Sequence, residues 1–232
     1  MRGDRVHLLA RQWALPDGAA VIMLPGRITA WKGHALLLEA LALLSARQPA
    51  LHWVCVLVGP SPDGRRGFGQ ELLRQAERLG LASRLRFAGH CADMPAALAL
   101  ADAVVIPSLK PEPFGRTAVE AQAMRRIVLA AGHGAALETV ADGVTGFLFP
   151  PGDAEALAGL LQHALSLDHG ARAWLGAQAR AHVLDRYTTT AMQQATLDVY
   201  EELLPRPFPQ RSVMAEAGNV SAVHAAGPRH DA

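Results

Sequence analysis

Short apolar runs recur along the first 150 residues, and they lack the polar alternation of strands that face water on one side. Such runs are typical of strands buried on both faces, as in a parallel sheet covered by helices. We expect strands at Ala20–Leu24, Trp53–Val58, Leu85–Ala88, Ala103–Pro107, Ile127–Ala131 and Gly146–Phe149.

Helical patterns fill the intervals between these runs. They cover His34–Arg47, Gly69–Gly80, Met94–Ala101 and Arg116–Met124. Strands that alternate with helices favour right-handed βαβ units. The pattern therefore predicts an α/β domain with a single Rossmann-like, doubly wound parallel sheet.

The pattern changes at Asp153, after which only helices are expected. They cover Asp153–Leu167, Ala171–Leu184 and Thr188–Leu204, and Asp153 and Thr188 are predicted N-caps. Prolines at 205, 207 and 209 then end the helical pattern, and few large apolar residues follow. We expect a remnant of a connector at 1–19, one domain at 20–204 and a disordered tail at 205–232.

Composition narrows the class of protein. The 232 residues are 50% hydrophobic, and 22 basic against 21 acidic residues give a net charge of +1. This balance argues against a nucleic-acid binder, which would carry a basic excess. Apolar stretches fall short of the roughly 20 residues that a membrane span needs, although peripheral membrane contact stays open. The N-terminus lacks a signal-peptide core, so the expected compartment is the cytoplasm. Cys55 lies in an apolar run and is expected to be a buried core residue.

The segment LPGRITAWKG follows the first expected strand, at the sheet edge where ligands of such folds bind. Gly26 would let the backbone come close to a ligand, and Arg27 and Lys32 could each reach a phosphate. The segment is neither a Walker loop nor a GxGxxG fingerprint. By itself it leaves open that Arg27 and Lys32 are solvated loop charges.

The segment PEPFGRTAVEAQAM places Glu112 before an expected helix start and Glu120 about one turn into that helix. A helix N-terminus attracts an anion through its free amides. The amides in question belong to Phe114, Gly115, Arg116 and Thr117. Carboxylates at such a place suit sugar or ribose hydroxyls, which donate hydrogen bonds to them. The alternative is a loop acid at 112 and a solvent-facing acid at 120.

These segments occur in a distinctive order: LPGR and KG, then LVG, FAGH, PEPFGRTAVE and HGAALETVADGVTGFLFPPGD. From about Val21 to Tyr200 this order resembles the C-terminal domain of glycosyltransferase family four. Enzymes of that family have the two-domain GT-B fold, and this half binds the activated donor. The resemblance therefore implies the C-terminal half of a GT-B fold, with a UDP- or GDP-sugar as donor.

The resemblance also implies roles for individual residues. Arg27 and Lys32 would hold the donor diphosphate together with amides near Gly115–Thr117. Glu120 would bind the ribose hydroxyls, and Glu112 would contact the transferred sugar in a role essential for transfer. The segment from Gly89 to Met94 would lie beside the nucleobase. The implied reaction is retaining transfer without a metal or another cofactor, because the chain has no DxD-type motif and its basic residues would stabilise the leaving diphosphate.

Two places depart from the family pattern. The chain has Arg125-Arg126-Ile127 where the family usually has Gly-x-Pro, and GHGAAL lacks the usual adjacent glycines. The positive φ of glycine costs an arginine energy, so we expect a distorted helix exit or a compromised site. His133 could approach the sugar or phosphate, or be plain polar surface. Glu138 is expected to cap or orient a loop.

The first expected strand begins at Ala20, whereas the family places a whole acceptor-binding domain before it. We therefore expect this chain to lack the acceptor half and to need a separate N-terminal acceptor domain. It could be a fragment, one product of a split gene or a standalone module. Two functions stay open: half of a glycosyltransferase, inactive by itself, or a non-catalytic module that binds a nucleotide or nucleotide sugar.

Overall fold

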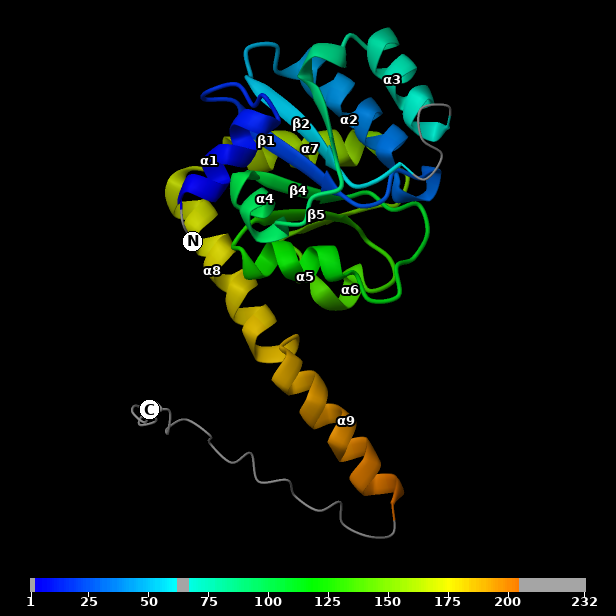
Figure 1. Ribbon diagram of the computed structural model, residues 1–232, viewed down its shortest axis with the longest axis vertical. Coiled ribbons are helices and arrows are strands. Elements are labelled where there is room, and N and C mark those ends of the chain that lie inside the picture. Colours follow the sequence, from blue (N-terminus) through cyan, green and yellow to red (C-terminus); the bar gives the residue numbers. More distant parts are fainter. Residues whose placement is uncertain (1–2, 62–66, 205–232) are drawn as a thin grey trace, which may run out of the picture. The chain divides into compact units, whose positions relative to one another are not determined.

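Six parallel strands form one sheet in the order β3-β2-β1-β4-β5-β6 (Figure 1). The computed structural model describes residues 3–61 and 67–204. The strands are β1 (Ala20–Pro25), β2 (Trp53–Val58), β3 (Leu85–Gly89), β4 (Ala103–Ile106), β5 (Ile127–Ala131) and β6 (Phe147–Phe149). Each predicted strand is present within one or two residues, and the predicted doubly wound α/β fold is confirmed.

Helices follow the predicted pattern closely. They are α1 (Gly3–Gln12), α2 (His34–Arg47), α3 (Phe68–Arg78), α4 (Met94–Leu100), α5 (Arg116–Ala123), α6 (Ala136–Thr139), α7 (Ala154–Ser166), α8 (His169–Arg186) and α9 (Thr189–Leu203). The predicted N-caps are confirmed, because Asp153 accepts the amide of Ala156 and Thr188 accepts that of Ala191. The sequence patterns missed α1 and α6. The prediction for 205–232 lies outside the described residues.

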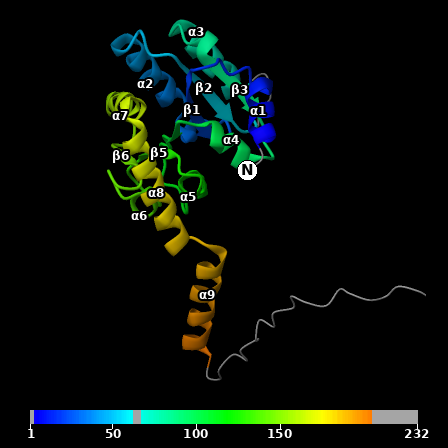
Figure 2. The same ribbon diagram turned by 90° about the vertical axis from the view of Figure 1, so that its left-hand side faces the viewer.

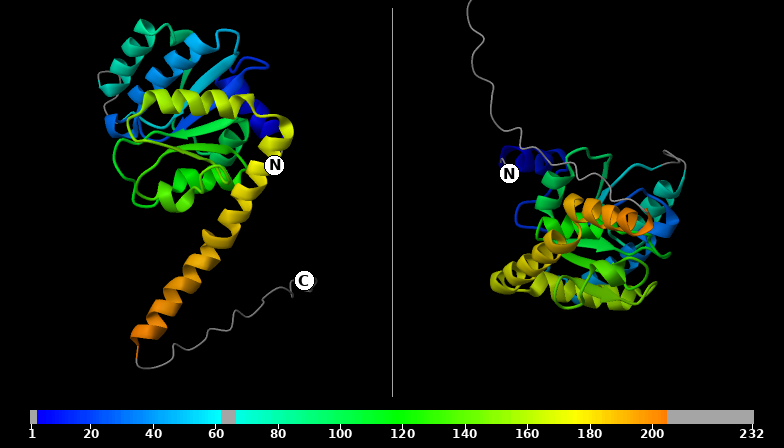
Figure 3. Two further views of the ribbon diagram at one scale, coloured as in Figure 1. Left: turned by 180° about the vertical axis from the view of Figure 1, so that it is seen from behind. Right: turned by 90° about the horizontal axis from the view of Figure 1, so that it is seen from below.

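Helices lie on both sides of the sheet (Figure 2), and a hydrophobic cluster lies on each of its faces. On one face α2, α3 and α7 cover side chains such as Leu24, Leu57 and Leu129. On the other face α1, α4 and α5 cover Met23 and Val56. The view from behind in Figure 3 brings α7, in yellow-green, in front of the strands. All residues of the inner strands β2, β4 and β5 are buried, which explains their unbroken apolar runs.

Strand order creates a switch point between β1 and β4. The chain runs outward from β1 to β3, and then returns past β1 to place β4 on its other side. Helices that follow these two strands leave on opposite faces, so their loops diverge and open a crevice at the carboxyl edge. The loops after β1 and β4 carry the segments around Lys32 and Glu112 that the sequence singled out.

The exit of α5 is regular, so the expected distortion there is wrong. Arg125 takes the left-handed conformation with φ of +58°, which the family pattern would give to a glycine. Its amide bonds the carbonyl of Gln122, and the amide of Arg126 bonds that of Ala121. This pair of bonds is a Schellman motif, which closes the helix end at the cost of strain in Arg125.

The chain separates into two compact units, Met1–Ala191 and Met192–Ala232. The sheet and its covering helices belong to the first unit. Cys55 is fully buried there, as predicted, and its burial raises the pKa of the thiol. Among residues 3–61 and 67–204, the helices are all too short or too polar to cross a membrane. The cytoplasmic location stays a prediction.

Candidate functional site

The loops after β1 and β4 touch directly at the switch point. The amide of Leu109 donates to the carbonyl of Trp31 at 2.7 Å. A Cβ added to Gly33 would lie 1.8 Å from the carbonyl oxygen of Pro107, and Gly33 also has φ of +76°. Only glycine allows the two backbones to come this close. The contact fixes where the side chains of the two loops can meet.

Lys32 and Glu112 meet across this contact. The Lys32 ammonium lies 2.7 Å from Glu112 Oε1, and the two side chains are 14% and 16% exposed. The Lys32 ammonium also lies over the ring of Trp31, 4.5 Å from its centroid. The hydroxyl of Ser108 donates to the same carboxylate oxygen of Glu112. The structure therefore brings together two residues that the sequence singled out, and Glu112 is more than a solvated loop acid.

Ser108 is the part of this site that the sequence analysis missed. It is 2% exposed and is the second residue after the end of β4. Its carbonyl also contacts His133 Nε2 at 2.8 Å, so it links His133 to Glu112. A small polar residue at the carboxyl end of a buried strand was the available signal.

A cavity of about 20 Å³, large enough for about one water molecule, lies beside Glu112. Ser108, His133 and Gly115 line it together with Glu112. The backbone carbonyl of Glu112 accepts the amide of Ala135, which ties the loop after β5 to the loop after β4. His133 thus lies beside Glu112, whereas the sequence left open whether it approaches the ligand or is polar surface.

The first turn of α5 opens toward the same place. Gly115 is its N-cap, with φ of +70°, and no side chain caps the helix there. The first amides of a helix lack partners within it, so those of Arg116 and Thr117 remain available to an acceptor. Glu112 and Gly115 line one cavity, so this turn adjoins the ion pair.

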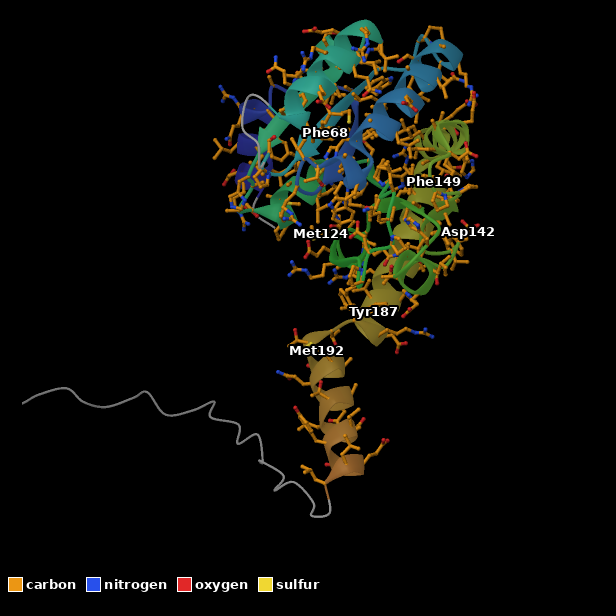
Figure 4. All side chains as sticks on the ribbon, turned by 90° about the vertical axis from the view of Figure 1, so that its right-hand side faces the viewer. Phe68, Met124, Asp142, Phe149, Tyr187 and Met192 are labelled. Atoms are coloured by element: carbon orange, nitrogen blue, oxygen red, sulfur yellow. The ribbon has the colours of Figure 1, made fainter. Side chains whose placement is uncertain are left out.

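Four predicted binding residues are exposed. The side chains of Arg27, Arg116 and Glu120 have no hydrogen bond or ion pair with another described residue. Phe114 is 51% exposed and packs edge-to-face on Tyr187, which lies at the end of α8 (Figure 4). The structure thus leaves these side chains free for a ligand and does not join them to the ion pair.

The predicted nucleobase segment follows β3. Gly89 ends this strand with φ of +66°, and Met94 begins α4. Between them Asp93 caps α4 and forms an exposed ion pair with Arg5 of α1, with 2.6 Å between Arg5 Nε and Asp93 Oδ2. The segment lies at the carboxyl edge, and the strands β2 and β1 lie between β3 and β4 in the sheet.

His34 lies beneath the site at the start of α2 and is fully buried. Burial, with a smaller contribution from the charge of Lys32, lowers its pKa to about 4. The ring packs edge-to-face on Phe68, which Figure 4 labels. His34 is therefore neutral at pH 7 and adds no charge to the crevice.

The arrangement suits a ligand with an anionic group and hydroxyls. Lys32 and the first turn of α5 offer positive potential, and Glu112 offers a hydrogen-bond acceptor. In the part of the chain that the structure describes, no three His, Cys, Asp or Glu side chains come together as metal ligands would.

Comparison with known proteins is consistent with this geometry. A D-inositol 3-phosphate glycosyltransferase of Salinispora arenicola is 34% identical over 221 residues, which are 92% of this chain and 48% of that protein. The chain thus spans about half the length of the curated relatives it matches.

Solved structures give the same picture. A glycosyltransferase of Rickettsia africae matches with a TM-score of 0.83 and 29% identity, over 88% of this chain and 53% of that one. Anabaena Alr3699/HepE, solved with UDP-glucose, matches with a TM-score of 0.78 and 32% identity, over 87% and 54% of the two chains. The model of the glycosyl transferases group 1 family matches residues 8–182, and this chain belongs to that family.

Proposed function

We propose that this chain binds a nucleoside diphosphate sugar in the crevice between the loops after β1 and β4. The observation that carries the proposal is the Lys32–Glu112 ion pair, which lies at the switch point beside the uncapped first turn of α5. It combines a cation and free amides for a diphosphate with a carboxylate for a hydroxyl.

The ion pair resolves a conflict of charge at this place. A bare carboxylate beside the first turn of α5 would repel a diphosphate. Lys32 lies 2.7 Å from Glu112 and neutralises it, so the anion meets a site of balanced charge. Glu112 can then accept a hydrogen bond from a hydroxyl of the transferred sugar while Lys32 faces the diphosphate.

The exposed residues complete the donor site in this proposal. Arg27, on the loop of Gly26 and Lys32, would close on the diphosphate, and Glu120 would accept the ribose hydroxyls. The backbone from Gly89 to Met94 would contact the base. Phe114, Gly115, Arg116 and Thr117 would form the anion-binding turn. That Alr3699/HepE was solved with UDP-glucose supports UDP as the nucleotide to test first.

The proposed reaction is sugar transfer with retention of configuration. The bond between the anomeric carbon and the diphosphate oxygen breaks, a bond to an acceptor hydroxyl oxygen forms on the same face of the sugar, and the proton of that hydroxyl passes to the released diphosphate. Arg27, Lys32 and the α5 amides would stabilise the charge on the leaving diphosphate, as a metal does in other transferases. We therefore propose that transfer needs no metal and no cofactor besides the donor.

We further propose that this chain supplies the donor half and that an N-terminal acceptor domain supplies the other. The match to about half of each relative's length supports this division. Without the facing half, the donor would lose contacts and shielding from water. We expect Kd values in the upper micromolar to millimolar range, about −4 to −6 kcal/mol, and no transfer by this chain alone.

Calorimetry with UDP and UDP-glucose tests the donor site. Glu120→Gln should lower the affinity for both ligands, because both contain the ribose. Glu112→Gln should lower the affinity for UDP-glucose more than the affinity for UDP. Glu39→Gln, an exposed acid on α2, is the matched control. The site would be refuted if UDP-glucose bound both site variants as tightly as the unchanged protein. The role of Glu112 at the sugar would be refuted if Glu112→Gln lost the same affinity for UDP as for UDP-glucose.

A transfer assay tests the division into halves. The chain is mixed with radiolabelled UDP- and GDP-sugars and a panel of acceptors, with and without a separately expressed acceptor domain and with or without EDTA. Transfer only in the mixture, unaffected by EDTA, is the expected result. Robust transfer by this chain alone would contradict the proposal that it needs a separate acceptor domain. Donor binding without transfer in any mixture would favour a non-catalytic binding module.

A further inference from the structure

A second polar pocket lies at the opposite end of α5 from the donor crevice. Its volume is about 310 Å³, and it is lined by Arg125, Arg126, His169, Arg172, Ala173 and Gly176. It lies where Met124, labelled in Figure 4, ends α5 and where α8 begins. The eight residues of α5 put about 12 Å between the two ends of this helix, so the pocket is separate from the donor crevice.

Two of its guanidinium groups are held rigidly by backbone carbonyls. Arg126 donates from Nε to Met124 at 2.9 Å and from Nη1 to Ala101 at 3.2 Å. Arg172 donates from Nε to Leu167 at 2.9 Å and from Nη2 to the carbonyl of Leu165 at 2.8 Å. A guanidinium has five N–H donors, so each keeps donors that a ligand could use.

Arg125 is the residue of this pocket that the fold itself does not explain. It is exposed, and its side chain has no hydrogen bond or ion pair with another described residue. Its φ of +58° strains the backbone, whereas glycine would close the same helix end without strain. Its carbonyl would lie 2.8 Å from a Cβ added to Gly176, so α8 packs closely on this turn. The chain therefore keeps a cation here at a cost in stability.

The acidic groups near the pocket are already engaged. Asp102 accepts the amide of Val21 through Oδ2 and pairs with Arg172 through Oδ1 at 3.2 Å. Asp168 accepts the amide of Ala171 as the N-cap of α8. Three guanidinium groups against these two carboxylates leave a positive charge. Arg180 of α8 also donates nearby, to the carbonyl of Ala123.

We propose that this pocket is a binding site for a phosphate group, carried by a soluble phosphate ligand or by a phospholipid headgroup. The rigid forks of Arg126 and Arg172 would orient the phosphate oxygens, and the free side chain of Arg125 would close on them. Planar guanidinium groups match the oxygen pairs of a phosphate. The pocket is large enough for a phosphate group with part of the molecule that bears it.

Titration with inorganic phosphate tests the site in its simplest form. Chemical-shift changes in the NMR spectrum should map to the start of α8 and to the turn at Arg125. Arg125→Gly should lower the affinity for phosphate at least about tenfold, as expected for the loss of a charge-assisted contact. The same variant should raise the Tm by about 2–4 °C, because glycine relieves the strained φ. A merely structural Arg125 would give the rise in Tm without the loss of binding.

Two matched variants separate the possible outcomes. Arg74→Ala removes an exposed arginine of α3 and should leave phosphate binding unchanged. Lys32→Ala should leave the chemical-shift changes at Arg125 and at the start of α8 unchanged, whereas phosphate bound at the donor crevice would be lost in that variant alone. The two proposals can therefore fail independently of each other.

Vesicles distinguish the two sources of phosphate. We expect Arg125-dependent binding to vesicles of phosphatidylcholine with phosphatidic acid if the ligand is a lipid headgroup, and binding of free phosphate alone if it is soluble. Phosphatidylcholine vesicles are the control for surface adsorption. The proposal is overturned if Arg125→Gly binds free phosphate and vesicles as tightly as the unchanged protein does, or if neither binds to either protein.

Discussion

Two ion pairs at opposite edges of the sheet use the same chemistry in different surroundings. At the carboxyl edge, Lys32 and Glu112 lie 2.7 Å apart with 14% and 16% of their side chains exposed. At the amino edge, Arg172 and Asp102 lie 3.2 Å apart with 27% and 40% exposed. The first pair is shorter and more deeply buried, yet it belongs to the candidate site rather than to the scaffold.

The partners of each pair account for this difference. Asp102 and Arg172 are also bonded to backbone groups of Val21, Leu165 and Leu167, so they join β1, α7 and α8. The charged ends of Lys32 and Glu112 contact each other and side chains, among them Ser108. A ligand can replace side-chain partners without dismantling secondary structure, which makes the first pair suited to binding and the second to support.

The largest expected effect concerns the backbone contact that brings Lys32 to Glu112. Gly33→Ala adds a Cβ only 1.8 Å from the carbonyl of Pro107 and forces a positive φ on alanine. Strain and overpacking together should lower the free energy of unfolding by about 2–5 kcal/mol. Urea unfolding followed by circular dichroism measures the loss.

Gly80→Ala is the matched control, because Gly80 has φ of +71° but open space around its Cβ position. It should cost only the backbone term of about 1–2 kcal/mol. Equal losses in the two variants would show that the close approach of the loops after β1 and β4 contributes nothing.

The second expected effect is a loss of stability in acid that depends on His34. Its pKa is about 4 in the folded protein and near 6.5 in the unfolded chain, so the unfolded chain binds the proton more readily. The contribution of His34 to the free energy of unfolding is therefore fully present above pH 6.5. It is lost as the pH falls toward 4, by about 3 kcal/mol in all.

His34→Leu should remove this part of the pH dependence, whereas His52→Leu, at an exposed position before β2, should leave it intact. Unfolding free energies from pH 7 down to pH 4.5 provide the measurement. A slope in His34→Leu as steep as in the unchanged protein would refute the assignment.

The sequence predicts this fold well where burial determines the pattern. All six residues of β2 are buried, which is why its short run of apolar residues, rich in valine, predicted a strand of a doubly wound sheet. The misses lie where that signal fails. Helix α1 has no buried residue, and α6 has only four residues in a loop. Helix α1 occupies residues that the sequence analysis assigned to a connector.

The candidate site is only partly predictable, because its geometry is non-local. Lys32 and Glu112 are recognisable in their own segments, but their contact depends on β4 lying beside β1. Ser108 was missed because a single serine after a strand is a weak signal. Arg125 was predicted to distort the exit of α5, yet the Schellman bonds hold it at φ of +58°.

The third expected effect separates the two cations of the donor crevice. Arg27→Ala removes a charge-assisted contact worth roughly 1.5–3 kcal/mol, about 10- to 150-fold in affinity for UDP. Lys32→Ala should lose at least as much, since it also leaves Glu112 without its partner beside the diphosphate. Calorimetry with Arg74→Ala as control checks both, and unchanged affinity in a folded variant would contradict that assignment.

The smallest expected effect concerns the ion pair at the amino edge. Asp102→Asn keeps an oxygen that can accept the amide of Val21 but removes the charge that faces Arg172. Partly exposed pairs contribute little, so the free energy of unfolding should fall by no more than about 1 kcal/mol, and by less in high salt. Asp102→Ala also removes the acceptor of the Val21 amide and should cost about 1–3 kcal/mol more. Urea unfolding at low and high salt measures both variants. If both variants lost the same free energy of unfolding, and both losses shrank in high salt, the charge of Asp102 rather than its bond to the Val21 amide would stabilise the fold. The contrast between the two ion pairs would then be wrong.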